Sequence, residues 1–334
     1  MKGNKLSSRK RLPLLYLAVL ALLAGGLVAC GDTNDGDETA REAPSVAGFP
    51  SANGETIEEI FRSLPEADVV VSPAASVFEV GKNRVPFGVF ELDGTQIDDA
   101  DIALYFAKDA KSPVEGPLPA RVDSLETKPA YAAMGSEGPG AATTVYVVEG
   151  AEFDHPGPWV GIAVIDGEDG PEATRIPSPA VGKFKSVAQV GDMAPKVSTP
   201  TAESVGGDLS KIDTRQPPSS MHDVDLKDVL GKQPVVLNFA TPALCETRVC
   251  GPVVDVTEQV KAEVGDGVAF IHQEIYNEND PSRGVRPQLK AFGLQTEPWI
   301  FLIGEDGRIK QRIEGAYGVA ELRAAVENLK TSGS

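Results

Sequence analysis

The chain contains few of the residues that catalytic and metal sites most often use. Among its 334 residues there are three cysteines and three histidines, and aromatic residues make up 6%. It has no surplus of positive charge, because 49 acidic residues outnumber 31 basic ones and the formal net charge is −18. This balance disfavours nucleic acid and bare anionic lipid surfaces as partners. No phosphate-binding loop, catalytic Ser–His pairing or paired-carboxylate pattern stands out, so we expect no organic cofactor.

The first residues have the pattern of an export signal. Basic residues precede an apolar run from Leu12 to Leu27, which is shorter than the roughly 20 residues that span a bilayer as a helix. A charged start, a short apolar stretch and small residues near a cleavage site are typical of a secretory signal peptide over residues 1–29. An uncleaved transmembrane anchor is the alternative, and no later run approaches that length.

The end of this segment, Leu27-Val28-Ala29-Cys30-Gly31, resembles the lipobox of bacterial lipoproteins. In that family the cysteine receives a diacylglycerol thioether and becomes the first residue of the mature chain, where it is often acylated as well. The resemblance implies a lipid anchor on Cys30 that holds the protein on the extracytoplasmic side of the cell membrane. An ordinary signal peptide with a chance cysteine is the alternative. Residues 30–56 are acidic and rich in small residues, so we expect a flexible tether.

The pattern of residues 57–188 is that of a β-rich domain. After a short helix expected over residues 56–64, runs rich in β-branched and aromatic residues recur between glycine, proline, aspartate and asparagine. These runs are Val69–Val71, Arg84–Leu92, Ile102–Phe106, Thr143–Val148 and Trp159–Ile165. Such spacing predicts an antiparallel β-sandwich. It resembles an immunoglobulin-like module in architecture only, because the Cys…Trp…Cys framework of that family is missing.

From residue 189 to residue 334 the pattern alternates between strands and helices. A proline-containing connection over residues 186–216 leads into this part. Strands are expected at Val235–Phe239, Val268–Ile275, Trp299–Ile303 and Arg308–Glu314, and helices at Asp225–Leu230, Pro252–Val264, Arg286–Phe292 and Val319–Lys330. This order predicts an α/β domain with a mixed sheet.

The motifs of this second part resemble those of membrane-tethered thioredoxin-like proteins, over roughly residues 190–330. The strand Val235–Phe239 is followed by cysteines and a helix, and Glu297-Pro298 precedes a strand and an Asp-Gly turn. The resemblance implies a thioredoxin-like fold and thiol-disulfide exchange. It also implies that Pro298 is the family's cis-proline, which faces the cysteines and shapes the groove for the substrate backbone. An ordinary trans proline is the alternative.

If Cys30 is lipidated, Cys245 and Cys250 form the remaining pair, and such a pair outside the membrane tends to oxidise. Five steps along a regular helix rise about 7.5 Å, which exceeds the limit of about 7 Å between the Cα atoms of a disulfide. An oxidised pair therefore requires residues 245–250 to leave the helix. Cys250-Gly251-Pro252 matches the family's Cys-Gly-Pro, but Val253 stands where the family has its second cysteine.

The proline two residues after Cys250 favours a helix start there. A helix N-terminus lowers a thiol pKa, and Arg248 is a further positive group. We therefore expect Cys250 to be the activated sulfur and Cys245 its partner, with the reverse assignment left open. Two departures weaken the enzymatic interpretation: Asn238 replaces the buried aspartate of thioredoxins, and Leu244 replaces the tryptophan before the motif. A structural disulfide that only staples a loop is the alternative.

The same fold is used by Sco-type copper chaperones, which add a distal histidine to two nearby cysteines. Residues 293–298, the corresponding region, contain no histidine. His272 lies on a strand, where a lone histidine is more often packed or exposed than a ligand, and His155 and His222 have no metal-ligand spacing. We therefore expect no metal site.

Together these observations predict a membrane-anchored, extracytoplasmic thiol-disulfide exchange protein that uses Cys245 and Cys250. Its partners would be exported proteins that carry disulfides or thiols. Two alternatives remain open. One is a non-enzymatic binding or scaffold lipoprotein with a structural disulfide, and the other is a Sco-like copper-handling protein.

Overall fold

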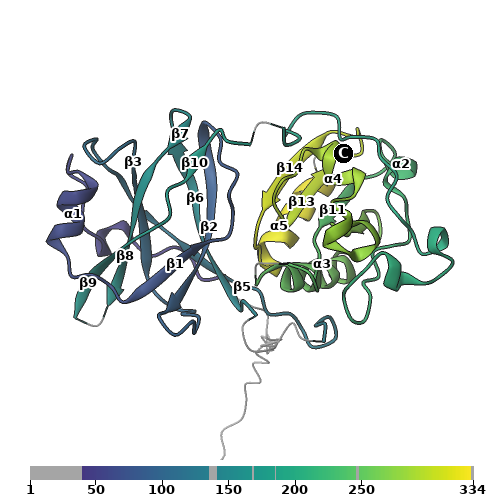
Figure 1. Ribbon diagram of the computed structural model, residues 1–334, viewed down its shortest axis with the longest axis horizontal. Helices are drawn as coiled ribbons and strands as arrows, with labels where there is room; N and C mark the ends of the chain where they lie inside the picture. Colours follow the sequence, from purple (N-terminus) through teal and green to yellow (C-terminus); the bar gives the residue numbers. More distant parts are fainter. Residues whose placement is uncertain (1–39, 135–140, 168, 185, 246–247, 332–334) are drawn as a thin grey trace, which may run out of the picture. The chain divides into compact units, whose positions relative to one another are not determined.

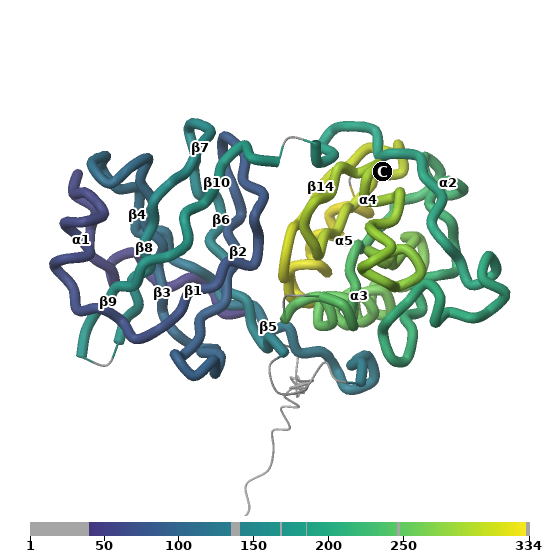
Figure 2. Tube along the Cα trace, viewed as in Figure 1, coloured from purple at the N-terminus to yellow at the C-terminus, as the bar shows by residue number. Residues whose placement is uncertain are grey.

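The structure of the protein is a computed structural model that describes residues 40–134, 141–167, 169–184, 186–245 and 248–331. The predicted signal peptide, Cys30 and the first part of the predicted tether lie outside the described residues. No helix within these ranges has the length and apolar character to cross a membrane. Figures 1 and 2 follow the chain through the two parts that the sequence predicts.

The described end of the predicted tether, residues 40–56, is packed onto the β-rich part. Arg41 exchanges two backbone hydrogen bonds with Val122, at 2.7 and 2.9 Å. The side chain of Phe49 is buried, and the Pro50 carbonyl accepts a hydrogen bond of 2.6 Å from the Tyr105 hydroxyl. Over these residues the chain is therefore anchored by backbone pairing and an aromatic contact, which the acidic composition alone did not indicate.

A short helix and two four-stranded antiparallel sheets make up the β-rich part. The helix is α1 (Ile57–Ser63), and it begins where Thr56 and Glu59 form a capping box. One sheet has the order β1-β2-β6-β5, with β1 (Val69–Pro73), β2 (Gly81–Glu91), β6 (Thr144–Phe153) and β5 (Arg121–Ser124). The other has the order β4-β3-β8-β9, with β4 (Glu115–Pro119), β3 (Ile102–Ala107), β8 (Val160–Gly167) and β9 (Gly170–Arg175). A further pair joins β7 (Gly157–Pro158) to β10 (Ala180–Val181).

Both sheets contribute to one hydrophobic core, as the sandwich prediction requires. Phe87 of β2 stacks on Tyr146 of β6 at 5.5 Å between ring centroids. Phe106 of β3 meets Phe153 of β6 edge to face at 5.2 Å. All four of these rings are almost fully buried. The structure thus has two antiparallel sheets around a common core, while an immunoglobulin-like relationship remains a prediction.

The second part is built on a mixed four-stranded sheet with the order β12-β11-β13-β14. Its strands are β11 (Val235–Phe239), β12 (Ala269–Gln273), β13 (Trp299–Ile303) and β14 (Ile309–Glu314). Strands β11 and β12 are parallel, whereas β13 pairs antiparallel with β11 and β14. The helices are α2 (Leu226–Val229), α3 (Cys250–Val264), α4 (Pro287–Phe292) and α5 (Val319–Thr331). Short 3-10 helices in this part are η2 (Glu203–Val205), η3 (Leu209–Lys211), η4 (Asn277–Asn279) and η5 (Pro281–Arg283), and one more, η1 (Val46–Gly48), precedes α1.

Helices cover both faces of this sheet, because side chains alternate along each strand. Val236 and Ile300 point to the core that α3 and α5 complete, whereas Leu237 and Phe301 point to the core completed by α2 and α4. The parallel strand–helix–strand unit followed by an antiparallel hairpin and a last helix is the order expected from the thioredoxin-like resemblance. That part of the fold prediction is confirmed (Figure 1).

Candidate functional site

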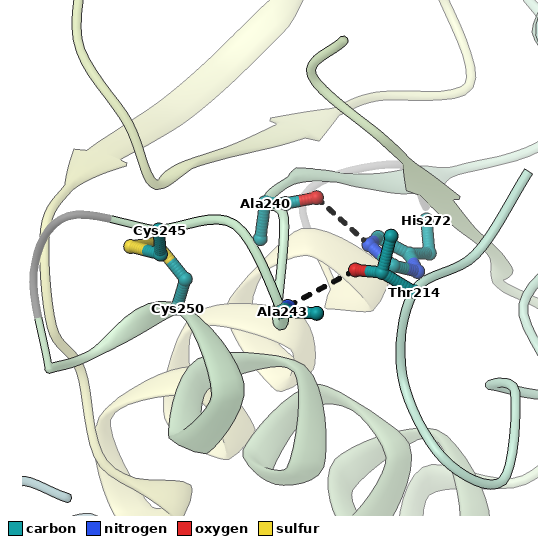
Figure 3. The surroundings of a disulfide bond; sticks show 6 residues. All are labelled: Thr214, Ala240, Ala243, Cys245, Cys250 and His272. Carbon is teal, nitrogen blue, oxygen red and sulfur yellow. Dashed lines mark hydrogen bonds between the residues drawn. A yellow bond between two sulfur atoms is a disulfide. The ribbon is translucent and has the colours of Figure 1, made fainter. Parts of the chain in front are cut away.

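A disulfide joins Cys245 to Cys250 at the start of α3 (Figure 3). Cys245 lies in the loop that follows β11, and Cys250 is the first residue of the helix. The two Cα atoms are 6.1 Å apart, within the range that a disulfide allows. The expectation that an oxidised pair must leave the regular helix therefore agrees with the structure.

The two sulfur-bearing residues differ in burial. Cys250 has no exposed surface and packs into the core beside Val253 and Val254 of its own helix. Cys245 is half-buried at the edge of the same core. A substrate sulfur must reach the sulfur that it attacks, so the burial favours Cys245 as the accessible one. This is the alternative that the sequence left open, rather than the assignment expected from the Cys-Gly-Pro motif.

The start of α3 places free backbone N–H groups beside Cys250. Helix α3 is 15 residues long, Pro252 is its third residue, and the N-cap residue Val249 provides no side-chain hydrogen bond. Its first backbone N–H groups and its dipole therefore favour negative charge at Cys250. Arg248, the further cation expected there, lies with its guanidinium 5.4 Å from the centre of the Phe90 ring and donates to the Gly94 carbonyl.

Asn238, which replaces the thioredoxin aspartate, is fully buried on β11. Its Nδ2 donates a hydrogen bond of 3.1 Å to the Thr257 hydroxyl of α3. That hydroxyl donates in turn to the Val253 carbonyl at 2.6 Å and lies 3.0 Å from the Tyr317 hydroxyl. The Oδ1 of Asn238 has no hydrogen-bond partner among the described residues. Position 238 therefore holds an amide that is fixed by a chain of hydrogen bonds. An amide cannot accept a proton as a carboxylate does.

The peptide bond between Glu297 and Pro298 is cis. Pro298 is buried at the start of β13, and its carbonyl accepts a hydrogen bond of 2.9 Å from the Gly315 backbone. The position and the isomer agree with those expected from the family. The role of Pro298 in a substrate groove remains a prediction.

A buried cluster that the sequence did not predict lies behind the cysteine loop. The Oδ2 atom of Asp213 is 2.8 Å from Nε2 of His222 and 3.3 Å from Nδ1 of His272. The hydroxyl of Ser219 is 3.3 Å from each of these ring nitrogens, and its backbone N–H donates to the same Oδ2 at 2.7 Å. Asp213, His222 and Ser219 come from one irregular segment, and His272 comes from β12.

In this cluster the charges of Asp213 and His272 shift one another's pKa. Burial alone would lower the pKa of His272, but the negative charges of Asp213 and Glu274 outweigh it and raise the pKa to about 9. Burial alone would likewise raise the pKa of Asp213, yet the two histidines hold it well below its usual range. A negative Asp213 and a positive partner are therefore the favoured charge states.

Two hydrogen bonds tie the cluster's surroundings to the cysteine loop (Figure 3). Nε2 of His272 lies 3.0 Å from the Ala240 carbonyl at the end of β11. The Ala243 backbone N–H donates to the Thr214 hydroxyl at 3.1 Å, and that hydroxyl donates to Glu274 at 2.7 Å. The loop that carries Cys245 is thus held at two points by the polar interior behind it. The third histidine, His155, lies beside Asp154 and Trp159 in the β-rich part.

A cavity of about 420 Å³ is lined in part by the two residues that precede Cys250. Its apolar lining includes Val70 and Phe90, and Arg248 and Val249 next to Cys250 also line it. Val70 is about half exposed. The described residues thus form a mainly apolar cavity whose lining includes the Arg248 cation.

No family model matches the chain, and no curated protein matches it. A solved structure from Chlorobium tepidum, described as a thiol:disulfide interchange protein DsbE, is 17% identical; the match covers 44% of this chain and 98% of that one, with a TM-score of 0.29. Thioredoxin-like superfamily protein SPOA0173 is 18% identical over 33% of this chain and 87% of that one, with a TM-score of 0.26. The ZirS C-terminal domain is 16% identical over 47% of this chain and 99% of that one, with a TM-score of 0.17.

Proposed function

We propose that this chain exchanges disulfides with exported proteins through Cys245 and Cys250. The observation that carries the proposal is the disulfide between the loop after β11 and the first residue of α3, on a thioredoxin-like sheet. A disulfide at this point combines one sulfur that is partly exposed with one at a helix N-terminus. Chemistry at such a pair needs no metal or organic cofactor.

The two different environments give each sulfur its own role. A substrate thiolate attacks the accessible sulfur of Cys245, the bond to Cys250 breaks, and Cys250 leaves as a thiolate. The N-terminus of α3 stabilises that thiolate, and a thiol of low pKa is the better leaving group. A second substrate thiolate then attacks the substrate sulfur of the mixed disulfide and releases Cys245 as a thiolate. The substrate has gained a disulfide and the pair is reduced, and the reverse sequence reduces a substrate disulfide.

The proposal includes the location expected from the first residues. A lipid on Cys30 would hold the pair on the extracytoplasmic side of the cell membrane, where exported proteins with disulfides or thiols are the substrates. Changing Cys30→Ser should move the protein from the detergent phase to the aqueous phase in a phase-partition assay. Retention of Cys30→Ser in the detergent phase would exclude the lipid as the anchor.

Trapping of mixed disulfides tests the exchange itself. The Cys250→Ser variant should accumulate mixed disulfides through Cys245 when cells are quenched with acid and their exported proteins are separated without reductant. The matched variant Cys245→Ser leaves only the buried Cys250 and should trap far less. The reverse result would assign the attack to Cys250. If neither variant traps a partner, and the pair has an ordinary thiol pKa with a potential below about −300 mV, exchange is wrong.

The burial of Cys250 also favours a second candidate, a binding or scaffold lipoprotein in which the disulfide only staples the loop to α3. In that case the double variant Cys245→Ser/Cys250→Ser loses stability but keeps its partners in a pull-down. Among the described residues, the arrangement of the histidines provides no ligand beside the cysteine pair for copper handling. Two of the three histidines are held around Asp213, and the third lies beside Asp154.

A further inference from the structure

Four donor atoms converge on one point in the interior behind the cysteine loop. They are Oδ2 of Asp213, Nε2 of His222, Nδ1 of His272 and the hydroxyl of Ser219. The carboxylate and ring atoms all lie within 4.8 Å of one another. In a tetrahedral zinc site with bonds of about 2.0–2.1 Å, neighbouring donors are about 3.4 Å apart. Four of the six separations among these donors are 2.8 to 3.3 Å, near this value. The two ring nitrogens lie within 4.8 Å of each other, so a small movement would admit an ion.

The hydrogen bond between His272 and Ala240 fixes which ring nitrogen faces this point. A carbonyl can only accept, so Nε2 of His272 carries the proton and donates it to the Ala240 carbonyl at 3.0 Å. In the neutral ring the lone pair of Nδ1 then points toward Oδ2 of Asp213 at 3.3 Å. A positive species is needed between the two atoms. A metal-bound histidine usually donates its other N–H to a carbonyl or carboxylate in this way.

The burial of the cluster makes a positive charge beside its acids necessary. Asp213, His222 and His272 are each 2% exposed or less, and Nδ1 of His222 is buried without a partner among the described residues. Glu274 lies nearby at 1% exposure, and its Oε2 also has no partner within the described ranges. A proton on His272 offsets one buried acid, whereas two acids, Asp213 and Glu274, are buried here. A divalent cation at the point of convergence would supply two positive charges.

We propose that Asp213, His222 and His272 bind one Zn²⁺ ion, with the Ser219 hydroxyl as a fourth oxygen donor. Two imidazole nitrogens and one carboxylate oxygen are a donor set that Zn²⁺ prefers. The site is closed to solvent, so the ion is structural. It links the segment of residues 213–222 to β12 and, through Ala240, supports the loop that carries Cys245. The sites of lipidation and disulfide exchange are separate from it.

Metal binding to the full chain tests the proposal. The protein is stripped with a chelator under mild denaturation, refolded, and titrated with Zn²⁺ and with Co²⁺. We expect one equivalent of Zn²⁺ per chain and a higher Tm when it binds. The Co²⁺ form should show the d–d absorption of a tetrahedral site without sulfur-to-cobalt charge transfer, because the donors are nitrogen and oxygen. The double variant Cys245→Ser/Cys250→Ser should bind both ions as the parent does.

Ligand variants complete the test. His222→Gln should weaken Zn²⁺ binding more than about a hundredfold, whereas the matched variant His155→Gln should leave it unchanged. If His222→Gln does not fold, Asp213→Asn and the Co²⁺ spectrum of the parent protein replace it. The proposal is overturned if the parent binds no Zn²⁺, in which case a proton on His272 is the positive species. It is also overturned if the ion is lost from the cysteine variant and kept by His222→Gln.

Discussion

The Thr214 hydroxyl accepts a hydrogen bond of 3.1 Å from the Ala243 backbone, two residues before Cys245. The same hydroxyl donates to Glu274 at 2.7 Å, and Glu274 has 1% of its surface exposed. The Thr214 side chain therefore provides one of two contacts between the cysteine loop and the polar interior behind it. This contact holds the backbone of the loop two residues before Cys245.

Thr214→Val keeps the shape of the side chain and removes the hydroxyl. We expect the free energy of unfolding to fall by about 1 kcal/mol, the contribution of one such hydrogen bond. Amide exchange at Ala243 should accelerate, because its N–H loses its partner. Thr214→Ser retains the hydroxyl and serves as the control. Equal exchange rates at Ala243 in the valine and serine variants would contradict this role.

Reduction of the disulfide should cost the folded state a moderate amount of stability. The bond closes a short loop, since its cysteines are five positions apart. For so few residues the chain-entropy relation gives about 2 kcal/mol. Urea unfolding of the oxidised and reduced protein measures the difference, and Cys245→Ser/Cys250→Ser should be insensitive to reductant. A loss above about 5 kcal/mol would indicate that the fold depends on the staple, which disfavours a pair that cycles during exchange.

The strands that the sequence predicted are mostly those with long apolar or alternating runs. Strands β4, β5 and β9 were not predicted, and each lies at the edge of its sheet. Strand β4, Glu115–Pro119, contains two prolines and shows no alternation. Proline is tolerated at an edge because its missing N–H need not pair. Composition therefore gives little indication of these strands, whereas β11 and β13 follow from their continuous apolar runs.

The candidate disulfide was predicted because its cysteines are neighbours in the sequence. The cluster around Asp213 was not, because His272 is 59 positions away from that carboxylate. Only the pairing of β11 with β12 and the course of the irregular segment before α2 bring them together. Asn238 and His272 are opposite one another in that pairing. The sequence shows each histidine, but no spacing or motif in it indicates that both contact Asp213.

The amide at position 238 can be tested by restoring the acid that thioredoxins carry. Asn238 is fully buried, so burial will raise the pKa of the carboxyl in Asn238→Asp above the ordinary value of about 3.9. A raised pKa means that the folded state prefers the neutral acid. Below about pH 4, the difference in unfolding free energy between Asn238→Asp and the parent therefore stays constant. Above about pH 4, the free energy of unfolding of Asn238→Asp falls relative to that of the parent by about 1.4 kcal/mol per pH unit until the pH reaches the folded-state pKa.

Urea unfolding of Asn238→Asp at several pH values between 4 and 8 measures this loss. The control is Asn238→Leu, whose stability should differ from that of the parent by an amount that does not depend on pH. If Asn238→Asp and Asn238→Leu show the same pH dependence, the carboxyl reaches water and the site is less enclosed than its contacts indicate.

An ion pair between the two parts of the chain gives the second pH prediction. Arg84 of β2 donates to Glu321 of α5 at 2.8 and 2.7 Å, and Arg121 lies 3.0 Å from the same carboxylate. Only 11% of the Glu321 side chain is exposed. Burial alone would raise the pKa of Glu321, but the two guanidinium groups outweigh it and hold the pKa below its usual range.

Because the folded-state pKa is lowered, the stabilisation is present above the unfolded value near 4.5 and is lost as the pH falls through the folded-state pKa. Glu321→Gln removes the carboxylate that Arg84 and Arg121 share, while Arg121 keeps Asp123 and Glu149 as partners. We therefore expect a loss of about 2 kcal/mol at pH 7. The gap between parent and variant should shrink as the pH falls below 4.5. Glu327→Gln, an exposed position on the same helix, is the matched control and should change stability by less than about 0.5 kcal/mol. A gap that stays constant down to pH 3 would show that the carboxylate charge does not join the two parts.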